Sequence, residues 1–246
     1  IPGLILSIAA FFLKEPKRIE EKVNLDKGVE RKNIFFHLKE HQKTLIPMFG
    51  GLIFMALIFY SFSFWAPTMM IRAFNISLSE VGLILGLITI ISSIIGTILA
   101  GSAVDYLRSK NYSDAPVRAA MIAVLLALPP IVTLSLVNSE IGAWICIALY
   151  LLFISSFAPL GLLAISGVST GSVKGQAAAI HAFLMMAFGL SLGPQLTAFF
   201  TDFIFADPDL LINSISLSGL IVLPISALLF KISLPRYRES SQKIAV

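Results

Sequence analysis

The chain has 246 residues, of which 57% are hydrophobic and 13% are charged, and its formal net charge is +4. Six stretches free of Asp, Glu, Lys and Arg are each long enough to cross a bilayer, since about 20 apolar residues span roughly 30 Å of hydrocarbon. These stretches exclude a soluble domain, whose helices carry charge on one face, and their lack of apolar–polar alternation excludes a membrane β-barrel.

The first predicted element, residues 1–13, is an apolar segment too short to span a bilayer. It makes only about 20 Å of helix, and the charged run KEPKRIEEK follows it. We expect it to be the end of a truncated transmembrane helix, and a short interfacial helix at a true N-terminus is the alternative. Residues 14–44 then form a cytoplasmic linker, whose second half is either an amphipathic helix on the membrane surface or a solvated tether.

Six full transmembrane helices are predicted after the linker, so the fold class is all-α, a polytopic membrane helix bundle. They cover residues 44–71, 81–104, 119–139, 141–173, 175–201 and 210–230. The fourth stretch is too long for one straight crossing and carries Pro159 near its middle. We expect the bundle to fill residues 45–234 and residues 235–246 to form a cytoplasmic tail.

The basic residues predict the orientation of the bundle. Of the 18 Lys and Arg residues, nine lie in 14–44, three in 105–118, one at Lys174 and four after residue 230. These segments alternate along the chain, so the positive-inside rule places them all in the cytoplasm, together with the C-terminus. We expect an integral protein of the bacterial inner (plasma) membrane. No nucleic-acid partner is expected, because the charges follow the membrane topology.

Glycine and proline interrupt the predicted spans. Gly82 with Gly86, and Gly189 with Gly193, have the four-residue spacing that lets helix backbones approach closely. Pro194 removes a backbone donor from the same span as the second pair. Spans with such interruptions are typical of secondary transporters.

Enzymatic chemistry has no support in the sequence. The chain lacks an HExxH motif, a GxSxG context, an intramembrane Asp pair and a nucleotide-binding loop. The single Cys146 lies within a span, which excludes disulfides and a cysteine metal site. His37 and His41 have chelate spacing, but no third ligand accompanies them. We expect no enzyme activity, no cofactor and no metal, which leaves a secondary transporter or a passive conduit.

Polar and aromatic side chains within the spans are the candidates for substrate binding. Each also has a structural explanation, because Ser and Thr in membrane helices commonly bond a carbonyl of their own helix and Trp often anchors at the interface. An ionisable group inside a span is a functional candidate by default, although His181 lies close enough to Lys174 for a structural role to stay open. The candidates are Tyr60, Phe64, Trp65, Ser92, Ser155, Ser156, His181, Met185 and Gln195.

Four sequence motifs resemble those of a known transporter family. The run GSAVDYLRSK at 101–110 resembles the loop motif of the major facilitator superfamily, with matches at Gly101, Asp105 and Arg108 and a departure at Tyr106, where Arg is common. The run WAPTMMIRAFNISLSEVGLILG also resembles that superfamily. The run VKGQAAAI followed by GLSLGP, and LRSKNYSDAPVRA followed by LPP, resemble its spinster-like branch. The chain therefore resembles the C-terminal half of such a transporter.

The resemblance implies an architecture. Residues 1–13 would end helix six, and the six spans would be helices seven to twelve. Helices seven, eight, ten and eleven would line the cavity, and helices nine and twelve would face lipid. The partners implied are the lipid bilayer, a small-molecule substrate and a missing N-terminal half of the same transporter.

The resemblance also implies a mechanism. It implies secondary active transport of a small organic or amphiphilic solute, an organic anion or a lysolipid-like molecule, by alternating access. We expect proton coupling, and facilitative transport is the alternative. Gly101, Asp105 and Arg108 would form a gating latch that holds the cytoplasmic side closed, and a solvated loop acid is the alternative for Asp105. The alternative function is a non-transporting membrane receptor or scaffold on the same fold.

Overall fold

The computed structural model describes residues 38–245 except residue 170, without the side chains of residues 171, 172 and 243–245. The chain divides into two units, Ile1–Lys32 and Asn33–Val246, and every described residue belongs to the second unit. The predicted helix end at residues 1–13 and nearly all of the predicted linker therefore lie outside the described residues.

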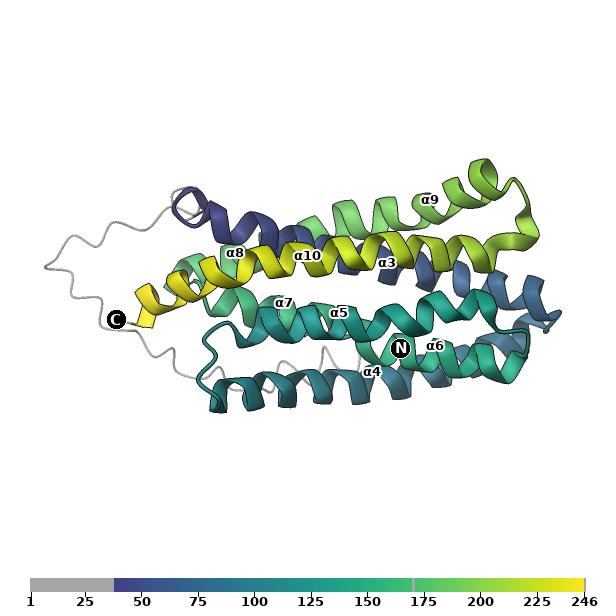
Figure 1. The fold of residues 1–246 in the computed structure, drawn as a ribbon, viewed down its shortest axis with the longest axis horizontal. Helices are drawn as coiled ribbons and strands as arrows, with labels where there is room; N and C mark the ends of the chain where they lie inside the picture. The colour runs from purple at the N-terminus through teal and green to yellow at the C-terminus, as the bar shows by residue number, and fades with distance from the viewer. Residues whose placement is uncertain (1–37, 170, 246) are drawn as a thin grey trace, which may run out of the picture. The chain divides into compact units, whose positions relative to one another are not determined.

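Six helical spans long and apolar enough to cross a membrane make up the described part of the chain, which contains no strand. The all-α membrane bundle is thus confirmed, and Figure 1 shows its helices running side by side. The elements are α3 (Gln42–Phe74), α4 (Leu78–Ser109), α5 (Ala115–Thr133), η1 (Leu134–Leu136), α6 (Glu140–Ile154), α7 (Phe157–Ser166), α8 (Gly171–Leu184), η2 (Met185–Leu190), α9 (Ser191–Phe199), η3 (Phe200–Phe205), η4 (Pro208–Leu210) and α10 (Leu211–Ala245). Helix α10 continues through the residues for which we predicted a tail.

Local sequence signals set several helix ends. Asn75 ends α3 in the left-handed conformation, with φ at 54°, a conformation that Asn adopts more readily than most residues. The hydroxyl of Ser77 accepts a hydrogen bond from the Glu80 amide and caps α4. Ser139 caps α6 in the same way through the Gly142 amide. These side chains satisfy backbone donors that a helix leaves without an internal partner.

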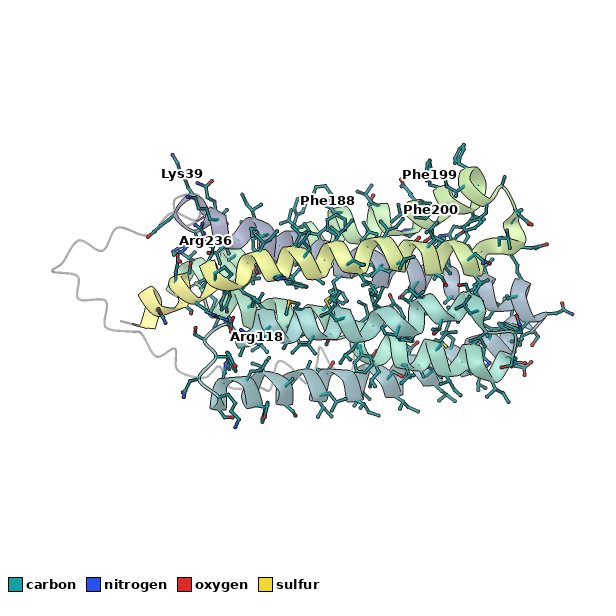
Figure 2. All side chains as sticks on the ribbon, viewed as in Figure 1. Lys39, Arg118, Phe188, Phe199, Phe200 and Arg236 are labelled. Carbon is teal, nitrogen blue, oxygen red and sulfur yellow. The ribbon has the colours of Figure 1, made fainter. Side chains whose placement is uncertain are left out.

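Helices α3 and α10 make the most extensive helix–helix contact in the described bundle. Helix α3 packs against α10 and against the η2–α9 segment, and α5 packs against α10 and α6. In the most apolar part of each helix, 61% of the residues of α3 are buried, against 11% for α4. Figure 2 shows side chains such as Phe188 and Phe199 along the outer edge of the Val173–Phe205 span. Helix α4 and this span are thus the two least buried.

Two of the six spans depart from a regular α-helix within their length. The fourth is broken between α6 and α7 at Ser155 and Ser156, as its length predicted. The fifth contains two π-helical segments, η2 and η3, on either side of α9. Such π-segments are rare and frequently occur at functional sites.

The two glycine pairs have opposite environments. A Cβ on Gly189 would lie 2.9 Å from the Cβ of Ala56, and one on Gly193 would collide with the Leu57 carbonyl of α3. The close approach predicted for this pair is therefore present. No described atom lies within 4 Å of a Cβ built on Gly82 or Gly86. The pair on α4 instead lines an open groove of about 510 Å³ between α3 and α4.

Candidate substrate site

The two interrupted spans meet α3 at Tyr60. The ring of Tyr60 packs edge-on against Phe157, the first residue of α7, with centroids 6.0 Å apart. A Cβ on Gly189 of η2 would lie 3.3 Å from Cδ2 of the same tyrosine. Tyr60 thus contacts both irregular segments, and because it is only half-buried it keeps part of its surface accessible.

Proline and serine explain the break between α6 and α7. Pro159 has no N–H to bond the carbonyl four residues earlier, that of Ser155. The hydroxyl of Ser156 donates to the Phe153 carbonyl at 2.8 Å, which is the local bond that serine commonly makes in a membrane helix. The hydroxyl of Ser155 is buried and has no hydrogen-bond partner among the described residues. The break therefore leaves one buried hydroxyl at mid-span without a partner in the described chain, and that hydroxyl faces Gly96 of α4.

A chain of hydroxyl groups fixes the helices beside Tyr60. The hydroxyls of Ser61 and Thr197 are 2.6 Å apart, and those of Thr197 and Ser218 are 2.9 Å apart, so the chain joins α3, α9 and α10. Trp65 donates from Nε1 to the Pro194 carbonyl at 2.9 Å, one turn farther along α3. Hydrogen bonds of this kind hold helices together in lipid, where no hydrophobic effect drives their association. Sequence reasoning missed this chain of hydroxyls.

His181 lies inside the bundle, toward the α8 end of the site. Its side chain is 4% exposed, and Nε2 has no hydrogen-bond partner among the described residues. The ring faces Gly161 of α7, where a Cβ would lie 2.5 Å from Nε2, and Phe49 of α3. His181, Met185 and Gly189 follow each other at four-residue spacing, which places them on one side of the span.

The other predicted site residues fall into two groups. Met185 is buried beside His181, and Ser92 is buried on α4, one turn before the point where Gly96 meets Leu152 of α6. Phe64 and Gln195 are exposed instead. The structure therefore brings Tyr60, Ser155, Ser156, His181 and Met185 into the neighbourhood of the two breaks, and leaves Phe64 and Gln195 on the outer surface of the described bundle.

Asp105 of the predicted gating latch has no ion-pair partner within the described chain. Asp105 and Arg108 are exposed near the end of α4, and no ion pair of Asp105 occurs among the described residues. A Cβ on Gly101 would meet no described atom within 4 Å. The Asp105 carboxylate and the uncovered side of Gly101 therefore lie on the surface of the described bundle.

A different carboxylate organises the same end of the bundle. Asp114 is fully buried and accepts hydrogen bonds from Arg118 at 3.0 and 3.3 Å and from Arg238 of α10 at 2.8 Å. The guanidinium of Arg118 also lies 4.4 Å from the ring centroid of Tyr112. The sequence analysis used the basic residues only to predict the orientation of the bundle, and it did not predict this cluster.

Metal coordination has no site in the described part of the chain. No group of three or more His, Cys, Asp or Glu side chains there could hold a metal ion.

Comparisons with known proteins agree with this architecture. A family model described as Major Facilitator Superfamily matches residues 1–241. No curated protein sequence matches the chain significantly. Fifteen solved chains match it in structure.

Two of the solved chains are crystal structures of a bacterial homologue of the human lysosomal transporter Spinster. The inward-facing, unoccupied form is 15% identical with a TM-score of 0.59, and the match covers 98% of this chain and 57% of that one. The inward-facing, occupied form is 14% identical with a TM-score of 0.58, covering 98% and 56%. The chain thus spans somewhat more than half the length of these structures and shares their fold. Together with the family match, this similarity shows that the chain belongs to the major facilitator superfamily and resembles its spinster-like branch.

Proposed function

We propose that this chain is the C-terminal half of a secondary active transporter that moves a small organic or amphiphilic solute by alternating access. The observation that carries the proposal is the meeting of the broken fourth span and the π-helical segment of the fifth at the half-buried Tyr60, because transporters build their substrate sites where helices depart from regular geometry. The match to 57% of a longer transporter supports an N-terminal half outside this sequence. Residues 1–13 would end the preceding helix, 14–44 would link the halves, 45–234 would form the bundle and 235–246 its cytoplasmic end.

The composition of the site supports an organic anion or a lysolipid-like substrate. The acidic residues of the described spans lie at or near the span ends, so this half offers no carboxylate to balance a cationic substrate at mid-span. Tyr60, Ser155, Ser156, His181 and Met185 would line the site from within this half. Ser92, Trp65 and the exposed Phe64 and Gln195 would complete it toward the other half. Proton coupling is part of the proposal, and its carboxylate carrier would lie in the N-terminal half.

The proposal is tested by replacing Tyr60 with phenylalanine in the complete transporter, reconstituted in proteoliposomes with an imposed pH gradient. The ring contact with Phe157 stays, and only the hydroxyl is lost. Loss of one hydrogen bond to substrate costs about 1 kcal/mol, so we expect the KM for uptake to rise about fivefold. Uptake is measured with a radiolabelled lysophospholipid and, separately, with fluorescein as an organic anion.

Tyr150→Phe is the matched control for Tyr60→Phe. The Tyr150 hydroxyl is buried without a partner among the described residues, so its removal is expected to leave KM unchanged. An equal KM for Tyr60→Phe and the unmodified transporter would remove Tyr60 from the site. Binding of either probe without any uptake would favour a receptor on this fold, and uptake that survives a protonophore would exclude proton coupling.

The orientation is testable by labelling single cysteines in a Cys146→Ala background. Ser113 and Asp209 are exposed in connections at opposite ends of the bundle. We expect Ser113→Cys to react with an impermeant maleimide only from the cytoplasm and Asp209→Cys only from outside. Ser113 is a better position than the neighbouring Asn111, whose φ of 64° disfavours cysteine. Labelling of both cysteines from the same side would contradict the proposed topology.

If Asp105 acts as a latch, replacing it should change the balance between transport states and leave the stability of the fold unchanged. Asp105 is exposed and has no ion pair within the described residues, so its proposed partner lies in the other half. Asp105→Asn is expected to shift the population toward the inward-facing state and lower turnover, with the thermal unfolding temperature unchanged. Accessibility of the cytoplasmic cavity mouth to a thiol reagent measures the shift. Unaltered accessibility with normal turnover would leave Asp105 as a solvated loop acid.

A further inference from the structure

A groove of about 680 Å³ lies between the first turn of α3 and the last third of α10, on the outside of the bundle. Gln42 and Lys43 line it from α3, and Arg236 lines it from α10. The walls are fixed by a buried contact, because the hydroxyls of Thr44 and Ser240 are 3.0 Å apart and join the two helices. The groove is therefore a preformed feature of the packing between α3 and α10.

Among the described residues, two basic side chains and no acidic one line this groove. Lys43 and Arg236 are both exposed, no acidic residue lines the groove, and neither side chain has an ion pair among the described residues. Two residues farther along α10, Arg238 is instead paired with Asp114. Figure 2 places Arg236 at the same end of the bundle as Lys39, another basic side chain. The groove thus offers two positive charges to an anion.

Exposed apolar side chains line the groove beside the two basic ones. Ile46, which is 67% exposed, lies one turn into the span from Lys43, and Ile232, which is 52% exposed, lies one turn into the span from Arg236. Cationic heads directly above exposed aliphatic side chains match an amphiphile whose anionic group sits at the interface and whose chain runs into the bilayer. Basic pockets between helices at the cytoplasmic interface bind the head groups of anionic lipids in this way.

We propose that this groove binds an anionic phospholipid of the cytoplasmic leaflet, with the phosphate between Lys43 and Arg236 and an acyl chain along Ile46 and Ile232. The site is separate from the proposed transport site, because Tyr60 lies 17 residues, or about 25 Å, farther along α3 than Lys43. The inference uses the proposed membrane orientation but does not depend on transport activity.

The test is native mass spectrometry of the complete protein in detergent, titrated with phosphatidylglycerol or with phosphatidylcholine. We expect one phosphatidylglycerol to bind with higher affinity than phosphatidylcholine. The double variant Lys43→Gln/Arg236→Gln should lower that affinity about 25-fold, since each interfacial cation contributes roughly a factor of five. Inorganic phosphate at the same concentration should not compete, because it lacks the acyl chain that the two isoleucines would contact.

The matched control is Lys110→Gln/Lys174→Gln, which removes the same charge from exposed positions outside the groove. This control variant should leave the affinity for the one tightly bound phosphatidylglycerol unchanged. Equal loss in both double variants, or equal affinity for the two lipids, would overturn the proposal. It would also be overturned if the protein bound no phosphatidylglycerol until the acidic residues of segment 14–37 were neutralised, because that result would make the linker the occupant.

Discussion

Gly193→Ala is expected to destabilise the bundle by about 3 kcal/mol, at the upper end of the usual cost of overpacking. A Cβ at this position would collide with the Leu57 carbonyl and lie 3.1 Å from the Ser61 amide, and backbone atoms cannot move aside as a flexible side chain can. The helices α9 and α3 would separate, which would also lengthen the 2.6 Å contact between Ser61 and Thr197. Thermal unfolding in detergent measures the effect.

The same substitution on α4 supplies the control for Gly193→Ala. Gly82 has no described atom within 4 Å of a built Cβ, and alanine is favoured over glycine inside a helix by about 1 kcal/mol. Gly82→Ala should therefore leave the unfolding temperature unchanged or raise it slightly. If both variants lost the same stability, the contact between α9 and α3 would not explain the loss at Gly193.

Asp114→Asn is expected to lower the free energy of unfolding by about 2 kcal/mol. Removing one member of a buried ion pair costs about 3–5 kcal/mol, and the cost is smaller here because the side chains of Arg118 and Arg238 are 22% and 47% exposed. Asparagine keeps an acceptor oxygen but removes the charge that holds two guanidinium groups together. We expect the connection between α5 and α10 to loosen first, which protease sensitivity near residue 114 measures.

Asp105→Asn is the control for Asp114→Asn, because it removes the same charge from an exposed residue with no described ion pair. The two variants should differ in the property that each one changes. Asp114→Asn should change stability, and Asp105→Asn should change the balance of transport states. Equal unfolding temperatures for the two variants would show that the buried cluster contributes nothing to stability.

The sequence alone determined that the chain is an all-α membrane bundle. The cost of placing a charge in hydrocarbon acts on each span separately, so the spans can be read without knowing how they pack. The break after Ser155 was predictable for a similar reason, because length and Pro159 are both local to that span. The family resemblance likewise rested on local motifs, and the match over residues 1–241 confirms it.

Only the tertiary structure decided which side chains meet. The two glycine pairs have identical spacing, but one contacts α3 and the other lines an open groove, because spacing along a helix does not specify what lies opposite. Asp114 and Arg238 are 124 residues apart, and Ser61 and Thr197 are 136 apart. The positive-inside rule identifies the side of the membrane on which a basic residue lies. Whether that residue is paired, as Arg238 is, or left open, as Arg236 is, depends on the packing of α10 against its neighbours.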